Sequence, residues 1–197
     1  MPHIPLLLVV SGPAGVGKTT LCTRMLEAYP SLQRVITSTT RKPRPGEKDG
    51  VDYHFLTPEA YQEALGAGEF YEFAEVHGNG YGTFKQEILG RLSRGEDLLL
   101  NIDVQGAESY RSAAVQDVVM GQSLVSLIVV PQSMEALKER MFSRGHDAPE
   151  IVARRLKNAE EEIAHREHFD HCIVSDTKEA DFSALQSVYL REKETRK

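Results

Sequence analysis

The stretch Leu6-Leu-Leu-Val-Val-Ser-Gly-Pro-Ala-Gly-Val-Gly-Lys18-Thr19 joins a short apolar run to the pattern Gly-x-x-x-x-Gly-Lys-Thr. Placed between a buried strand and a helix, this pattern is typical of a loop that cradles phosphate groups. Its glycines let the loop turn backbone N–H groups inward, and the start of the helix adds the positive end of its dipole. The loop is therefore predicted to bind the phosphates of a nucleotide.

Two side chains of this loop add chemistry that backbone amides lack. Lys18 is long enough to reach the β and γ phosphates of a triphosphate, and the Thr19 hydroxyl can ligate magnesium. The alternative is a glycine-rich turn that binds nothing, but a chance match to the pattern is rare at ordinary glycine content. The predicted phosphate-binding residues are Gly12, Pro13, Ala14, Gly15, Val16, Gly17, Lys18, Thr19 and Thr20.

Length and composition narrow the class of protein. The 197 residues, 41% hydrophobic and 26% charged, suffice for one globular domain with a sizeable core. Cys22 and Cys172 form neither a disulfide framework nor a zinc motif, which suits a reducing cytoplasm. A net charge of -6 argues against nonspecific nucleic-acid binding, and the apolar run at residues 4–10 is too short to span a bilayer. We expect a cytoplasmic protein with no nucleic-acid, membrane or obligate protein partner.

Apolar runs and helical patterns alternate along the chain. Buried strands are expected at residues 6–10, 97–102, 124–130 and 171–174. Helices are expected at residues 19–28, 58–67, 84–94, 133–143, 149–167 and 181–193. This order predicts an α/β fold with a parallel sheet flanked by helices. Between residues 34 and 83 the short aromatic runs 51–56 and 70–76 predict an inserted, mostly β subdomain.

A second cluster of polar residues, Thr37-Ser-Thr-Thr-Arg41-Lys-Pro-Arg44-Pro-Gly, follows the first helix and strand. Guanidinium groups suit bidentate contacts to phosphate, and the two prolines stiffen the segment that presents them. A solvated basic loop is the alternative, and the residues of this segment alone leave both interpretations open.

Taken in order, the motifs resemble those of the guanylate kinases, a family of P-loop nucleoside monophosphate kinases. The resemblance covers nearly the whole chain and rests on GPAGVGKTT at 12–20, STTRKPRPGE at 38–47, DYHF at 52–55, EFYEFAEVHGNGYGT at 69–83, LNIDVQG at 100–106 and the arginine-bearing segment 138–156. It implies a P-loop core (1–36, 84–140 and 160–197), a GMP-binding subdomain (about 37–83) and a helical lid (about 141–159).

The resemblance also implies an acceptor site. In the family, groups matching Arg41, Arg44, Tyr53 and Tyr81 hold the phosphate of GMP. Groups matching Glu72 and Asp103 read the base, and hydroxyls at Thr37 and Thr83 stand where the family commonly has serine. The chemistry agrees, because guanine presents two N–H donors that a carboxylate accepts, whereas adenine would leave that carboxylate unpaired.

Magnesium is the cofactor that the resemblance implies, held with ATP by Thr19. The family commonly has aspartate where this chain has Asn101, so one metal-side carboxylate is replaced by an amide. Asn101 and Asp103 are then expected to act indirectly, by orienting a metal-bound water.

Arginines on the last helices match the family's triphosphate and transition-state groups. They are Arg140, Arg144 and Arg155, with Arg144 and Arg155 in or beside the lid. A salt-bridged surface is the alternative, and it is the one that we favour for Arg154. At Ser175-Asp176 the family often has Asn-Asp, and contacts to adenine are implied near this pair.

The implied reaction transfers the γ-phosphoryl group of MgATP to GMP, and to dGMP, giving ADP and GDP. It needs no general base, because the acceptor phosphate, with a second pKa near 6, is mostly ionised at pH 7. A P-loop kinase for another nucleoside monophosphate or a phosphorylated sugar is the nearest alternative. A noncatalytic scaffold module of the same fold is another, but such modules characteristically have degraded phosphate loops.

Overall fold

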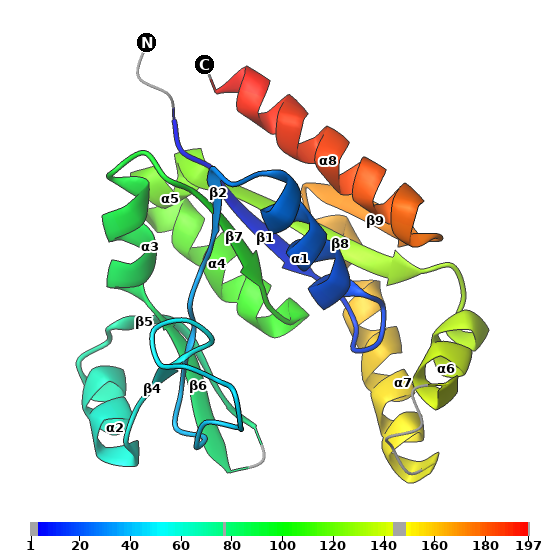
Figure 1. Cartoon of the computed structure of the whole chain (residues 1–197), viewed down its shortest axis with the longest axis horizontal. Helices are drawn as coiled ribbons and strands as arrows, with labels where there is room; N and C mark the ends of the chain where they lie inside the picture. The colour runs from blue at the N-terminus through cyan, green and yellow to red at the C-terminus, as the bar shows by residue number, and fades with distance from the viewer. Residues whose placement is uncertain (1–3, 77, 144–148, 197) are drawn as a thin grey trace.

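A computed structural model describes residues 4–76, 78–143 and 149–196 of the chain. Its main sheet is parallel throughout, with strand order β2-β7-β1-β8-β9 (Figure 1). The strands are β1 (Leu7–Ser11), β2 (Leu32–Arg34), β7 (Asp97–Asn101), β8 (Leu124–Pro131) and β9 (His171–Ser175). The predicted parallel sheet flanked by helices is therefore confirmed.

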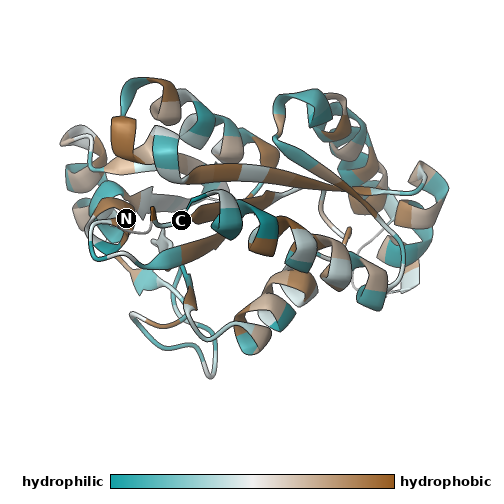
Figure 2. Ribbon diagram, turned by 90° about the horizontal axis from the view of Figure 1, so that it is seen from above, coloured by the Kyte–Doolittle hydropathy of each residue, from teal (hydrophilic) through white to brown (hydrophobic). Residues whose placement is uncertain are grey.

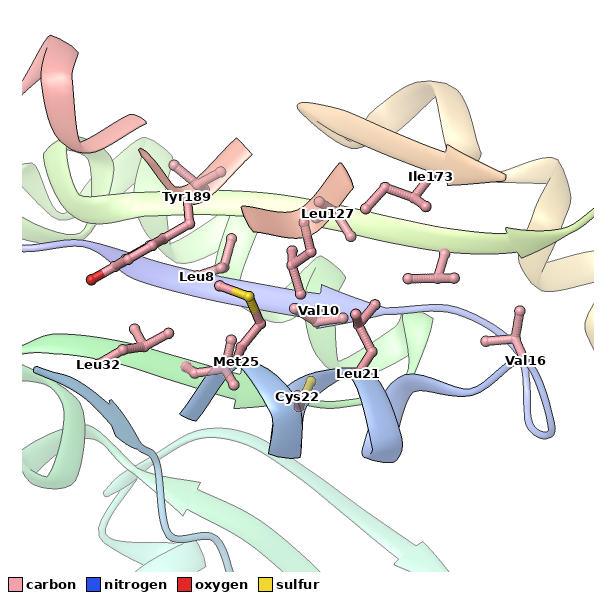
Figure 3. Close-up of a cluster of buried hydrophobic side chains, with 14 of the residues drawn as sticks. Leu8, Val10, Val16, Leu21, Cys22, Met25, Leu32, Leu127, Ile173 and Tyr189 are labelled. Carbon is pink, nitrogen blue, oxygen red and sulfur yellow. The ribbon is translucent and has the colours of Figure 1, made fainter. Parts of the chain in front are cut away.

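The central strand β1 is buried on both faces, which explains its unbroken apolar run. Leu8 and Val10 point into one hydrophobic cluster, together with Met25 and Tyr189 (Figure 3), while Leu7 and its neighbours on the same face point into the other. Apolar strands consequently form the middle layer of the molecule, with helices of mixed polarity on both sides (Figure 2).

Helices cover the two faces of this sheet. One face packs against α1 (Lys18–Ala28), α6 (Met134–Ser143), α7 (Pro149–Ala164) and α8 (Lys178–Thr195). The other packs against α3 (Lys85–Leu92), α4 (Val104–Gln116) and α5 (Val118–Ser123). None of the helices in the described part of the chain has the length and apolar character needed to cross a membrane.

A second, smaller sheet lies between β2 and α3 in the chain, with strand order β4-β3-β6-β5. It consists of β3 (Ser38–Thr39), β4 (His54–Phe55), β5 (Phe70–Val76) and β6 (Asn79–Phe84), with α2 (Pro58–Gly66) packed beside it. In Figure 1 this insertion and the pair α6 and α7 extend from the same end of the main sheet, on either side of the loop that follows β1.

Several predicted boundaries were wrong by more than two residues. The helix expected at 149–167 ends at Ala164, and a short 3-10 helix (Arg166–His168) follows it. The helix expected at 181–193 begins at Lys178, because Thr177 caps its start by accepting a hydrogen bond from the Ala180 amide at 3.1 Å. Of the run 51–56, only His54–Phe55 is a strand.

Helices α4 and α5 were not predicted. Helix α4 carries Gly106 in its first turn, and an interior glycine lowers helix propensity. The structure gives the reason for that glycine, since a Cβ there would lie 2.4 Å from the Cδ1 atom of Ile102. Close packing of this turn on the end of β7 therefore overrides local propensity.

Candidate active site

The loop between β1 and α1 surrounds a small cavity. Gly12, Gly15 and Gly17 all have positive φ, which a residue with a Cβ adopts only at a cost. At Gly12 a Cβ would also lie 2.1 Å from the carbonyl oxygen of Val129, so no larger residue fits there. The cavity measures about 310 Å³ and is lined by Pro13, Ala14, Gly15, Gly17, Lys18, Thr19 and Thr20.

Lys18 bends back over this loop. Its Nζ donates to the carbonyl oxygen of Pro13 at 3.1 Å and to that of Gly12. Burial lowers the pKa of Lys18, while the nearby carboxylates of Glu162 and Asp103 act in the opposite direction. The ammonium group of Lys18 is thus hydrogen-bonded to uncharged carbonyl oxygens of the loop, and the oxygens of an anionic phosphate can replace them as acceptors.

On the smaller sheet, Arg41 is the centre of a cationic and aromatic cluster. Its guanidinium lies 5.4 Å from the ring centre of Tyr53 and 5.9 Å from that of Phe55. Tyr53 meets Tyr81 edge to face, with 6.2 Å between ring centres. The pKa of Arg41 is raised, chiefly by its hydrogen bonds to Glu47 and also by the Tyr81 hydroxyl. The structure therefore brings together three of the four predicted phosphate-holding residues.

The fourth, Arg44, lies on the exposed loop after Arg41, and a hydrogen bond from its backbone amide fixes its position. Its amide donates to Oε2 of Glu47 at 2.7 Å. Thr37 lies at the entry to the smaller sheet, and its carbonyl oxygen accepts from the His54 amide at 2.9 Å. Thr37 immediately precedes strand β3 in the chain, and Arg44 lies on the loop that follows it.

The predicted base-reading acids differ in their surroundings. Glu72 on β5 is buried and accepts a hydrogen bond from the Thr83 hydroxyl on β6 at 2.7 Å. Burial raises the pKa of Glu72, and the charge of Asp103 raises it further. Asp103 is exposed and caps α4 by accepting from the Gly106 amide at 2.7 Å. A single carboxylate is thus desolvated on the sheet, and a second stands nearby at the end of β7.

The main sheet and the smaller sheet share a cleft of about 540 Å³. Thr19 and Asn101 line it from the core, and Thr37 and Tyr53 line it from the insertion. Within the core, the Asn101 side-chain amide donates to the Thr19 hydroxyl at 3.4 Å. Thr19 and Asn101, two of the residues predicted to serve a magnesium ion, are therefore neighbours on the core side of this cleft.

Arg140 makes contacts that the sequence did not indicate. It donates to the carbonyl oxygen of Val16 at 3.2 Å, to the Ser175 hydroxyl at 2.9 Å and to the carbonyl oxygen of Asp176 at 3.0 Å. It therefore ties the phosphate loop to the end of β9. Arg155 is exposed on α7, and Arg144 lies outside the described residues.

A cavity of about 350 Å³ lies beside the phosphate loop, against Arg140. Gly15, Gly17, Thr20, Arg24, Asp176 and Lys178 are among the residues that line it. Asp176 is fixed there, since its amide donates to Asp181 at 2.8 Å and its carboxylate accepts from Gln132 at 2.9 Å. Gly15, Gly17 and Thr20 line both this cavity and that of the phosphate loop, so the two cavities are adjacent.

The sequence model of the guanylate kinase family matches residues 5–192. The chain belongs to the guanylate kinase family. It is 38% identical to the guanylate kinase of Idiomarina loihiensis over 195 residues, 98% of this chain and 90% of that protein. It is 44% identical to that of Thiobacillus denitrificans over 170 residues, 86% of this chain and 78% of that protein. A crystal structure of guanylate kinase from Anaplasma phagocytophilum superposes with a TM-score of 0.73 at 31% identity, covering 97% of this chain and 87% of that one.

Two acids of this guanylate kinase site were missed by sequence reasoning. Glu47 ends the segment STTRKPRPGE and pairs with Arg41, and its place in a basic, proline-rich turn was the available signal. Glu162 on α7 lines a cleft with Asp103, and its buried Oε2 has no hydrogen-bond partner among the described residues. No local pattern distinguishes Glu162 from the other acids of its helix.

Proposed function

We propose that the protein is an enzyme that transfers the γ-phosphoryl group of MgATP to GMP, and to dGMP, producing ADP and GDP. Membership of the guanylate kinase family supports this activity. The observation that carries the proposal is the shared cleft, which Thr19 of the phosphate loop lines together with Thr37 and Tyr53 of the insertion. Two phosphate-binding sites that meet end to end are what transfer between two nucleotides requires.

For the acceptor, we assign the phosphate of GMP to Arg41, Arg44, Tyr53 and Tyr81. Arginine forks and phenolic hydroxyls are suitable donors to phosphate oxygens. Positive charge is needed here because each pair of unit charges brought within 4 Å repels by about 4 kcal/mol at an effective dielectric of 20. The cluster around Arg41 supplies that charge on the acceptor side.

We assign the guanine base to Glu72, with Asp103, Thr37 and Thr83 as further polar partners. The N1–H and 2-amino groups of guanine are adjacent donors, and the Glu72 carboxylate is a buried acceptor held by Thr83. A buried acceptor of this kind discriminates strongly, because a base without matching donors leaves it unpaired. AMP and UMP are therefore expected to be poor acceptors.

For the donor, we assign the triphosphate of ATP to residues 12–20 and the adenosine to the cavity beside Arg140. Thr19 would hold magnesium, with Asn101 and Asp103 acting through bound water. The fit is chemically sound, because hydroxyl, amide and carboxylate oxygens are the donors that this ion prefers. Among the described residues no group of three or more His, Cys, Asp or Glu could hold a metal, so the phosphates would supply most of its ligands. Bound magnesium supplies charge neutralisation of the triphosphate.

During transfer, the protein positions the two phosphates and stabilises negative charge. Lys18 exchanges its Pro13 carbonyl partner for phosphate oxygens, and Arg41 holds the acceptor in line. No side chain needs to remove a proton, because the attacking oxygen belongs to an ionised phosphate. We further propose that segment 141–159 closes as a lid and that Arg155 and Arg144 then approach the triphosphate. We place the reaction in the cytoplasm, where Cys22 and Cys172 would stay as the free thiols seen in the structure.

A coupled assay with MgATP and a panel of GMP, dGMP, AMP and UMP tests this proposal. GMP and dGMP should be phosphorylated, and AMP and UMP should be slower by about 10⁴-fold, the selectivity that hydrogen-bonding sites achieve. Phosphorylation of AMP at the rate of GMP would contradict the base assignment. Absence of transfer to every nucleotide, with intact GMP binding, would point to a binding module instead.

A further inference from the structure

Glu47 occupies the terminal edge of the Arg41 guanidinium, formed by Nη1 and Nη2, and makes no hydrogen bond to Nε. Nη1 donates to Oε2 of Glu47 at 3.0 Å and to the carbonyl oxygen of Lys42 at 2.7 Å, and Nη2 donates to Oε1 of Glu47 at 2.9 Å. Since a guanidinium has five N–H groups, these three bonds leave Nε–H and one N–H of Nη2. Those two lie side by side on the same edge, and this pair forms a second bidentate fork.

Glu47 is itself fixed by the loop that carries both arginines. Its Oε2 also accepts from the Arg44 amide at 2.7 Å, and its own amide donates to the Arg44 carbonyl oxygen at 3.0 Å. The Glu47 carboxylate therefore links the side chain of Arg41 to the backbone of Arg44 by hydrogen bonds. Its pKa is lowered by its hydrogen bonds to Arg41 and Arg44, so it is ionised at neutral pH.

Other contacts also restrict the orientation of the Arg41 side chain. The backbone amide of Arg41 donates to the Thr39 hydroxyl at 3.1 Å, and Tyr53 and Phe55 lie beside the guanidinium. The Tyr81 hydroxyl is another neighbour, because it contributes to the raised pKa of Arg41 after Glu47. The guanidinium is thus held beside Tyr53 and Tyr81, the two tyrosines that we assign to the acceptor phosphate.

We propose that Glu47 is a positioning residue for the acceptor site: it takes the terminal fork of Arg41 so that the Nε and Nη2 edge is presented to the phosphate of GMP. This inference rests on the proposed function and assigns a role to a residue outside the phosphate contacts. A competing arrangement would have Glu47 act as a stand-in for the phosphate that GMP must displace. The geometry disfavours it, since Glu47 is tied to the Arg44 amide and leaves Nε–H and one N–H of Nη2 for another anion.

The test compares Glu47→Gln with Glu63→Gln, a matched change of an exposed acid on α2 of the same insertion. Because Gln loses the charge and one acceptor, Glu47→Gln should raise the KM for GMP about tenfold, as loss of an orienting partner commonly does. The KM for ATP should not change, and kcat should change far less than the KM for GMP. Glu63→Gln should match the unmodified protein in all three.

Binding of guanosine separates positioning from a general structural effect. Guanosine has the base but no phosphate, so Glu47→Gln should bind it as tightly as the unmodified protein does while binding GMP about tenfold more weakly. Equal weakening of guanosine and GMP would show that the insertion is merely damaged and would overturn the proposal. Tighter GMP binding by Glu47→Gln would also overturn it, by showing that Glu47 competes with the phosphate.

A double-substitution cycle adds a test that is independent of folding. In an Arg41→Ala background the Glu47→Gln change should have almost no further effect on GMP binding, because the group that it orients is gone. Additive losses would place the action of Glu47 elsewhere and overturn the proposal. If the unmodified protein phosphorylates GMP and Arg41→Ala weakens it while Glu47→Gln does not, the proposed function stands and only the role of Glu47 fails.

Discussion

The two nucleotide sites are built from different parts of the polypeptide. The proposed triphosphate part of the donor site is one continuous stretch, residues 12–20, whose shape depends on glycines of positive φ. The proposed acceptor site gathers side chains from residues 37 to 103, on the smaller sheet and its loops and just after β7. The phosphate loop depends mainly on the conformation of one short segment. The proposed acceptor site forms only when the smaller sheet packs against the main sheet.

The sites also differ in how their charges are held before a nucleotide binds. Lys18 at the proposed donor site donates to the carbonyl oxygens of Gly12 and Pro13, which carry no net charge. At the acceptor site Arg41 is already paired with Glu47, and Glu72 is paired with Thr83. We therefore expect substitutions at the donor site to abolish transfer, and substitutions at the acceptor site to change affinity and selectivity by graded amounts.

The largest expected effect is that of Lys18→Ala. Removing the ammonium group should lower kcat/KM by about 10²- to 10³-fold, as loss of a group that stabilises transition-state charge commonly does. GMP binding measured by calorimetry should be unchanged, because Lys18 belongs to the donor site. Lys138→Ala, an exposed lysine on α6, serves as control. Loss of GMP binding in Lys18→Ala would show that the two sites are not separable.

Arg41→Ala should have the next largest effect. Because its guanidinium faces the acceptor, the change should lower kcat/KM for GMP by roughly 100-fold, as loss of a bidentate charged contact does. ATP binding in the absence of GMP should stay the same. The measurement is a pair of titrations, one with each nucleotide. A selective loss of ATP affinity would assign Arg41 to the donor site and contradict its assignment to the acceptor site.

Glu72→Gln should change selectivity more than rate. Replacing one acceptor oxygen with an amide N–H should narrow the preference for GMP over AMP by roughly 1 to 3 kcal/mol. The ratio of kcat/KM for the two acceptors measures this, and Glu75→Gln, an exposed acid on the same strand, is the control. Discrimination that stays the same would remove Glu72 from base recognition and leave the buried carboxylate without a role.

The same contrast explains what the sequence could and could not predict. The run at 6–10 and the glycines after it predicted β1, the phosphate loop and α1, because all their determinants are contiguous. The pairing of Arg41 with Glu47 needed the turn between them, and the approach of Glu72 to Asp103 needed the insertion to pack against the core. Helix α4 was missed because its first turn holds Gly106, which the side chain of Ile102 requires for steric reasons that helix propensity does not describe.

Arg140 shows the limit of assigning a residue by resemblance. Its position in the sequence suggested a phosphate contact, but in the structure it donates to Val16, Ser175 and Asp176. Ser175 stands where the family often has asparagine, and its hydroxyl is held by both Arg140 and Asp181, the latter at 2.8 Å. The catalytic role of Arg140 remains a prediction, and its observed contacts brace the phosphate loop.

The smallest expected effect is a pH dependence of base binding, measured with guanosine because it lacks a titrating phosphate. Guanine donates to the ionised form of Glu72, so affinity should fall by at most about tenfold per pH unit below the pKa of the unliganded carboxyl. Burial raises that pKa above 4.5, so the fall begins at a higher pH than an ordinary glutamate would give. The free energy of unfolding changes with pH in the opposite direction to guanosine affinity. A carboxyl whose pKa is raised by folding stabilises the folded protein at pH values below that pKa, and this contribution is lost as the pH rises through it. Glu72 therefore cannot cause acid unfolding and weak binding together, and thermal melts at each pH separate the two. In Glu72→Gln guanosine binding should be weaker and flat with pH, and a slope as steep as that of the unmodified protein would assign the titration to another group.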